Sequence, residues 1–167
     1  GQDIYPVYIL DPTLSKAKGQ ASLVWLNHCL KSFDSSLSNK LSVFSGNTLN
    51  ILSELISKYG ISNIYFDKSY EVEVRLNDDK LIEQLRKLGC YCLQENQQTL
   101  WDISKILKKD NTAYKVFTPF FKKGCLMERE PKIPEKSNDL LPMKKFEEAS
   151  SIDSIIKIGK NKWVKKI

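Results

Sequence analysis

The sequence predicts an α/β protein: a Rossmann-like parallel sheet with helices on both faces, in three layers ordered α/β/α. Short runs of β-branched and aromatic residues recur along the first hundred residues, and longer segments with apolar residues spaced by three or four lie between them. Strands that alternate with helices of this length require crossover connections. Crossover connections produce parallel sheets that are covered by helices.

The first strand and the first helix are predicted in residues 4–12 and 20–37. The first segment, IYPVYILDP, is a continuous apolar run closed by an Asp-Pro step, which indicates a strand buried on both faces. The second segment is predicted as an amphipathic helix, because its apolar residues recur at helical spacing. They are Leu23, Leu26, Leu30, Phe33 and Leu37. We expect at least Leu26 to face the sheet.

A second strand-helix unit follows directly. Residues 41–46 predict a strand, and Asn47 or Thr48 is suited to cap the next helix. That helix carries apolar residues at helical spacing and ends at Gly60, a residue that favours helix termini.

The same pattern recurs once more and then weakens. Residues 62–67 predict a third strand. The charged segment 70–88 predicts a helix that a glycine closes, and residues 90–94 predict a fourth strand. Residues 99–107 predict one or two further helical turns.

Composition changes after residue 122. Prolines appear among mixed charges, and the last 47 residues carry twelve Lys or Arg against seven Asp or Glu, which accounts for most of the net charge of +6. We therefore expect an α/β domain over residues 1–122 and a basic, Pro-containing linker over residues 123–167. A basic tail fits contact with nucleic acid or another domain, and it equally fits a solvated linker.

Composition also narrows the class of protein. The length of 167 residues suits one domain, and no apolar run approaches the roughly 18 residues that cross a bilayer. The four cysteines lack the C-x-x-C spacing of zinc sites, and His28 is the only histidine. We expect a cytoplasmic protein without membrane contact or a metal site, and a surface or packing role for His28.

Ligands of doubly wound sheets bind beyond the carboxyl ends of the strands. Here those ends are Leu10 and Asp11, Ser45 and Gly46, Asp67 to Tyr70, and Glu95 and Asn96. No G-x-G-x-x-G sequence or Walker loop lies there, which argues against an ordinary dinucleotide or P-loop nucleotide site. For Asp11, ligand contact and capping of the Pro12 turn remain alternatives.

Four segments carry the most specific sequence patterns of the chain. They are GQASLVWLNHCLKSFDSSL (19–37), IYFDKSYEVEVRLND (64–78), LQENQQTLW (93–101) and YKVFTPFFKK (114–123). The G-x-A-S helix opening, the Tyr-Glu-x-x-x-Arg segment and the Tyr-x-Val-Phe-Thr-Pro-Phe sequence are specific only in combination. In this order and spacing, the segments resemble the N-terminal α/β domain of the DNA photolyase/cryptochrome family. The resemblance runs from about residue 4 to residue 122.

This resemblance implies the antenna-chromophore-binding domain of a DNA photolyase, whose parent protein repairs cyclobutane pyrimidine dimers with light and FAD. The FAD and the lesion pocket belong to a C-terminal helical domain that lies outside this sequence, so we expect no catalysis by the chain alone. The family's first strand, of the Trp-Phe-Arg-Arg-Asp-Leu-Arg type, also has no counterpart here, which favours a fragment. The expected partners are the helical FAD domain and, through the full-length parent, damaged DNA. An unpaired strand edge also favours self-association.

The resemblance implies two alternative places for an antenna. A flavin or deazaflavin is expected near Leu10, Asp11 and Ser22, although many relatives carry arginine where this chain has Leu23. The sequence does not choose between this type and a folate.

Methenyltetrahydrofolate is expected around the segment that follows the third strand. Asp67, Tyr70 and Glu73 lie there, and Lys18 is the nearest match to a histidine that contacts folate in some relatives. Glu73 is the preferred ligand, since a carboxylate accepts hydrogen bonds from the amino and ring N–H groups of a pterin.

The aromatic segment 114–123 has two interpretations. The resemblance implies that Phe117 and Phe120 anchor a cluster at an interdomain connection, which the Thr118-Pro119 step begins. Alternatively, these aromatics cover the edge of the sheet.

Two other functions stay open at this point. One is a stand-alone chromophore- or nucleotide-binding module, and the other is a cryptochrome-like or degenerate domain that binds ligands or proteins without catalysis. Photolyases and cryptochromes differ in the C-terminal domain, so these residues do not separate them.

Overall fold

The structure is a computed structural model that describes residues 3–13, 19–128, 130–131, 133 and 142–158. The chain divides into two units. Unit 1 comprises Gly1–Gly60 and Ser137–Ile167, and unit 2 comprises Ile61–Lys136. Unit 2 is therefore inserted in the sequence of unit 1.

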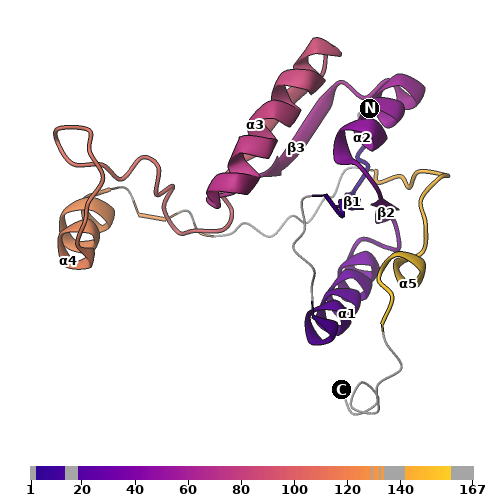
Figure 1. Cartoon of the computed structure of the whole chain (residues 1–167), viewed down its shortest axis with the longest axis horizontal. Helices are drawn as coiled ribbons and strands as arrows, with labels where there is room; N and C mark the ends of the chain where they lie inside the picture. The colour runs from indigo at the N-terminus through magenta and orange to yellow at the C-terminus, as the bar shows by residue number, and fades with distance from the viewer. Residues whose placement is uncertain (1–2, 14–18, 129, 132, 134–141, 159–167) are drawn as a thin grey trace. The chain divides into compact units, whose positions relative to one another are not determined.

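Unit 1 contains one parallel strand pair and its helices (Figure 1). Strand β1 (Val7–Leu10) pairs in parallel with β2 (Ser42–Ser45), and α1 (Gln20–Ser36) makes the crossover between them. Helix α2 (Thr48–Tyr59) follows β2, and the short α5 (Ile152–Ile155) lies near the end of the described chain. Every strand and helix of this unit before α5 overlaps a predicted one.

The core of unit 1 forms where α1 and α5 pack on one face of the strands. Its buried members are Leu30, Leu41, Val43, Ile152 and Ile156. Leu26 packs against this core, as predicted, whereas the neighbouring Trp25 is 72% exposed. The predicted apolar stripe of α1 is slightly rotated, because Val24 and Asn27 are its most buried residues and Phe33 is exposed.

Residues 142–156 belong structurally to unit 1. The Lys144 N–H donates to the Ile4 carbonyl (2.8 Å), and the Ser150 N–H donates to the Val43 carbonyl (2.9 Å). The ring of Phe146 stacks on another aromatic ring of unit 1, that of Tyr5, at a centroid distance of 4.3 Å. This part of the predicted linker thus packs on the α/β framework, while the predicted boundary at residue 122 stays a prediction.

Unit 2 repeats the parallel arrangement. Strand β3 (Asn63–Asp67) pairs in parallel with β4 (Tyr91–Glu95), and α3 (Val72–Lys87) connects them. Helix α3 packs on β4 and contributes Leu85, which is completely buried. Gly89 has a φ of 80°, a left-handed conformation that favours glycine, so it allows the turn into β4. The parallel strands and their helices confirm the predicted α/β class.

The last part of unit 2 is less regular. Residues 117–127 form a continuous helical stretch, made of α4 (Phe117–Pro119), the π-helical turn η1 (Phe120–Gly124) and the 3-10 turn η2 (Cys125–Met127). The helical turns predicted for residues 99–107 are wrong, because this segment forms bends and turns. In none of the described segments is a helix both long and apolar enough to cross a membrane.

We predict that Leu41→Ala lowers the free energy of unfolding by about 2–5 kcal/mol, because Leu41 is 1% exposed in the core of unit 1 and its loss leaves a cavity. Trp25→Ala removes a larger but exposed side chain and should cost less than about 0.5 kcal/mol. Denaturant titration of both full-length variants measures the difference. Equal losses in the two variants would contradict the placement of the core.

Candidate functional site

A group of polar side chains meets at the carboxyl ends of β3 and β4 in unit 2. Parallel strands end at the same edge of a sheet, so the loops that follow β3 and β4 lie close together. We name this group the strand-end network; its members are Lys68, Tyr70, Asn96, Thr99, Asp102 and Ser104.

Asp102 is the centre of the network. Its two carboxylate oxygens each accept from the Lys68 ammonium at 3.2 Å. The Ser104 hydroxyl and backbone N–H donate to its Oδ1 at 2.6 and 3.1 Å. The Tyr70 hydroxyl lies 3.0 Å from the same oxygen. The bonds to Ser104 form a local turn of the kind that competes with regular helix formation.

Asn96 connects the network to the backbone. The Tyr70 hydroxyl lies 2.7 Å from Asn96 Oδ1, and the Thr99 hydroxyl lies 2.8 Å from the same oxygen. The amide nitrogen of Asn96 donates to the Thr99 carbonyl (2.8 Å). Each of these groups therefore already has a partner within the protein.

The electrostatics of the network stabilise an ionised Asp102. Burial by itself raises the pKa of this carboxyl, but hydrogen bonds from Ser104, Lys68 and Tyr70 outweigh burial and lower the pKa to about 2. The pKa of Tyr70 is raised, first by burial and also by the nearby Asp102 carboxylate. The Lys68 ammonium also lies 5.7 Å from the centre of the Tyr70 ring. The network thus holds a Lys⁺–Asp⁻ pair and a neutral phenol.

The other predicted residues of unit 2 lie around this network. Asp67 ends β3, and its carboxylate accepts from the Gln97 N–H (3.0 Å), so it fixes the loop after β4. Glu73 lies in the first turn of α3, is exposed, and forms no hydrogen bond or ion pair with any described residue. Its carboxylate is free to meet a ligand.

In unit 1, Asp11 ties the end of β1 to the start of α2. It is 6% exposed, and its two oxygens accept four hydrogen bonds, from the backbone N–H and hydroxyl groups of Thr13 and Thr48, at 2.6–2.9 Å. Burial raises its pKa, but these four bonds outweigh burial and lower the pKa to about 2. Asp11 therefore caps the Pro12 turn, through the Thr13 N–H, and also anchors the N-terminus of α2.

The remaining predicted residues of unit 1 are not gathered around Asp11 by any contact. Leu10 packs against the core. Ser22 is exposed on α1 and lines a shallow hollow of about 510 Å³ together with Trp25 and Cys29. Lys18 lies outside the described residues.

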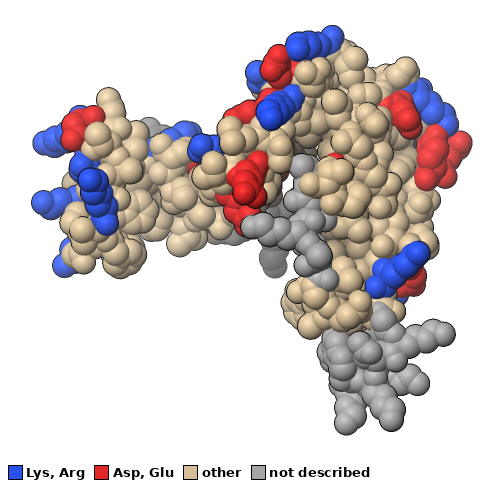
Figure 2. Space-filling model, in the orientation of Figure 1, with Lys and Arg blue, Asp and Glu red and all other residues tan. Residues whose placement is uncertain are grey.

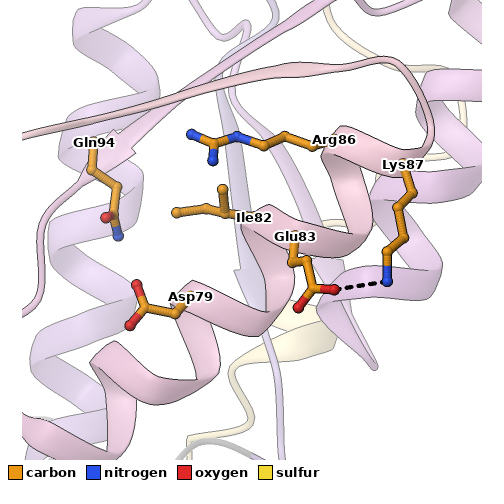
Figure 3. A pocket seen from close by; sticks show the side chains of 6 residues that line it. All are labelled: Asp79, Ile82, Glu83, Arg86, Lys87 and Gln94. Carbon is orange, nitrogen blue, oxygen red and sulfur yellow. Dashed lines mark ion pairs between the residues drawn. The ribbon is translucent and has the colours of Figure 1, made fainter.

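A second shallow groove, of about 590 Å³, lies beside α3 (Figure 3). It is lined by five residues of α3 and by Gln94 of β4, and its lining includes an ion pair between Glu83 and Lys87 at 2.8 Å. The groove contains none of the predicted site residues. Among the described residues, no cluster of His, Cys, Asp and Glu is suited to hold a metal ion.

Sequence reasoning located the loops of the strand-end network but missed Asp102, Thr99 and Ser104. A usable signal was present, because an Asp-x-Ser sequence shortly after a strand is typical of a turn in which the carboxylate accepts from the residue two positions on.

We predict that Asp102 makes the stability of the protein depend on pH in the acid range. Its folded-state pKa of about 2 lies below the ordinary value of 3.8, so its contribution is complete above about pH 4 and is lost as the pH falls toward 2. Urea unfolding between pH 6 and pH 2 should show a smaller acid loss for Asp102→Asn than for the wild type. Glu54→Gln, which removes an exposed carboxylate of α2, should keep the wild-type profile; parallel profiles for all three proteins would refute the assignment.

Comparison with known proteins identifies the family. The profile of the DNA photolyase family matches residues 1–137. The chain is 30% identical over 142 residues to a deoxyribodipyrimidine photo-lyase of Agrobacterium fabrum, which covers 82% of this chain and 29% of that protein. It is 26% identical over 110 residues to Cryptochrome-1 of Aedes aegypti, which covers 63% of this chain and 20% of the relative.

Solved structures agree with the sequence comparison. A bacterial class III photolyase from Agrobacterium tumefaciens is similar with a TM-score of 0.85 and 27% identity, covering 97% of this chain and 34% of that chain. An archaeal photolyase from Sulfolobus tokodaii shares the fold with a TM-score of 0.72 and 20% identity, covering 96% and 36% of the two chains. The chain thus spans about a third or less of the length of these proteins. It belongs to the DNA photolyase family, and it corresponds to the α/β part of that family's fold.

Proposed function

We propose that this chain is the antenna-chromophore-binding α/β domain of a DNA photolyase. The observation that carries the proposal is the similarity to the bacterial class III photolyase along 97% of the chain. The activity of the parent protein would be light-driven repair of cyclobutane pyrimidine dimers with FAD, which the family binds in a helical domain. Because both similar structures and the 30% identical relative are photolyases, a cryptochrome-like role is the less favoured alternative.

The residues of unit 1 fit a flavin-type antenna poorly. Asp11 already uses both carboxylate oxygens within the protein, and it is buried. A ligand that needs this carboxylate would have to displace the bonds that hold the start of α2. Of the described residues expected at this site, Ser22 is exposed and Leu10 is half-buried against the core. The archaeal photolyase of similar fold is described as holding two FAD molecules, with the implication of a novel light-harvesting cofactor, which keeps a flavin as the competing antenna.

The residues of unit 2 fit the pterin of methenyltetrahydrofolate better. Glu73 offers a free, exposed carboxylate that can accept hydrogen bonds from ring N–H and amino groups. Asp67 ends β3 and Tyr70 lies between β3 and α3, and both are hydrogen-bonded to the loop after β4. We assign Glu73 the role of direct ligand, and Tyr70 and Asp67 the role of positioning the segment that carries it.

The chain's own residues would bind and orient the chromophore and would perform no chemical step. The bound antenna would supply light absorption and would pass the excitation to FAD. The proposed partners are accordingly the helical FAD domain and, through the full protein, damaged DNA. In the described chain each strand pairs with one other strand, and β2 is also bridged to Ser150; self-association through a free strand edge stays a prediction.

We predict that the purified chain binds methenyltetrahydrofolate and that Glu73→Gln weakens this binding about tenfold, which corresponds to roughly 1.4 kcal/mol for a charged hydrogen bond. Titration followed by absorbance and fluorescence between about 350 and 450 nm measures both proteins. Glu54→Gln, an exposed change on α2 in unit 1, is the matched control and should leave binding unchanged.

The same titration with FMN and a deazaflavin tests the alternative antenna. Binding of a flavin that is insensitive to Glu73→Gln would reject the folate assignment but keep the antenna function. Failure of all three compounds to bind would overturn the proposed function of this chain as an antenna domain.

A further inference from the structure

The segment 114–127 of unit 2 has an inner side that is firmly packed. The Phe120 ring meets the Tyr114 ring edge to face at a centroid distance of 6.2 Å. Gly124 is buried, and a Cβ atom there would lie 2.5 Å from Ile106 Cγ2, so the helical turn approaches its neighbours more closely than any other residue permits. Cys125 is also buried. These contacts fix which side chains of the segment face outward.

The outer side of this segment is unusually apolar. Phe117 is 73% exposed, and its ring stacks on the ring of Phe121 at 5.7 Å with an interplanar angle of 8°. Three further large apolar side chains of the segment are exposed: Val116, Leu126 and Met127. Of the two residues predicted to be anchors, Phe120 therefore packs inward, whereas Phe117 faces outward.

Lysines dominate the charges of this segment, and the exposed Glu128 follows it directly. Residues 114–127 contain three lysines and no aspartate or glutamate. Lys115, Lys122 and Lys123 are exposed and form no ion pair with any described residue. In Figure 2, several Lys and Arg side chains and a smaller acidic group border uncharged surface over the part of unit 2 that carries α4.

We propose that this surface binds a protein helix whose apolar stripe is flanked by acidic residues. We name it the aromatic-lysine patch; its members are Lys115, Val116, Phe117, Phe121, Lys122, Lys123, Leu126 and Met127. Phenylalanine and methionine are enriched in the centres of protein interfaces, and exposed apolar groups with a polar rim mark such sites. The unpaired lysines supply the charge complementarity, which selects aspartate and glutamate on the partner.

Two other occupants fit the patch less well. Single-stranded nucleic acid binds to open ring faces, but Phe117 and Phe121 stack on each other, which occupies one face of each ring. A membrane-surface helix is a regular amphipathic α-helix, whereas residues 117–127 are a succession of α, π and 3-10 turns. A short groove-binding or face-binding helix matches the size and chemistry of the patch.

The test uses the full chain and a fluorescent 18-residue helical peptide with a leucine stripe flanked by glutamates. Fluorescence anisotropy should show binding of this peptide and at least tenfold weaker binding of the same peptide with lysines in place of the glutamates. Phe117→Ala should weaken binding about tenfold, because exposed aromatic anchors dominate such interfaces. Trp25→Ala, which removes an equally exposed aromatic residue from unit 1, is the control and should have no effect.

The charge contribution is tested by Lys122→Glu with Lys123→Glu. This double variant should weaken binding several-fold at low salt and less at high salt, because exposed charges are screened. Circular dichroism should be unchanged in every variant, since the altered side chains are exposed. No binding of the acidic peptide, insensitivity to Phe117→Ala, or preferential binding of oligo(dT) or of anionic phosphatidylserine vesicles would overturn the proposal. The chromophore titration with Glu73→Gln and the peptide titration are separate measurements. A failure of the antenna proposal can therefore be distinguished from a failure of the helix-binding proposal.

Discussion

Parallel pairing of the strands is the constraint on which the rest of the structure depends. Two parallel strands cannot be joined by a tight turn, so β1 and β2 need α1 as a crossover, and β3 and β4 need α3. Each crossover carries the chain back to the amino end of the strands, so the paired strands run in one direction and the loops that follow them meet at the carboxyl end. Polar residues that are distant in sequence consequently come together at the carboxyl ends of the strands.

At both of these strand ends a carboxylate, buried in Asp11 and half-buried in Asp102, uses its hydrogen bonds to hold a neighbouring segment. Asp11 accepts from Thr48 at the start of α2, and Asp102 accepts from Lys68 after β3. Both carboxyls have a pKa of about 2, because hydrogen bonds outweigh the effect of burial. A carboxylate whose oxygens are committed in this way organises the site but has little capacity left for a ligand. This distinction favours the exposed Glu73 as the proposed ligand.

The C-terminal described segment shows how unit 1 is completed by residues far along the chain. The Phe146 ring packs between the rings of Tyr5 and Tyr59, and its N–H donates to the buried hydroxyl of Ser42. Glu148 pairs with Lys58 and accepts from the Tyr59 hydroxyl. Ile152 and Ile156 then enter the core. Unit 1 is thus held together by contacts that span the whole insertion of unit 2.

The sequence by itself determined the α/β class, the order of the main strands and helices, and the loops at the strand ends. Periodicity and terminating glycines act within a few residues, so a local pattern is sufficient to locate these elements. The family was also accessible, because its distinctive segments occur in order along the chain.

Only the tertiary structure decided which polar groups are committed and which are free. Asp11 and Thr48 are 37 positions apart, and Lys68 and Asp102 are 34 apart, so no local pattern reveals that their hydrogen bonds are satisfied. The same holds for residues 99–107, where bends and turns, one of them held by the Asp102 side chain, replace the predicted helix. It also holds for the aromatic segment, where the half-buried Phe120 packs on the Tyr114 ring and Phe117 is left exposed. Hydrogen-bond saturation and side-chain burial depend on neighbours in space, and the chain acquires those neighbours only when it folds.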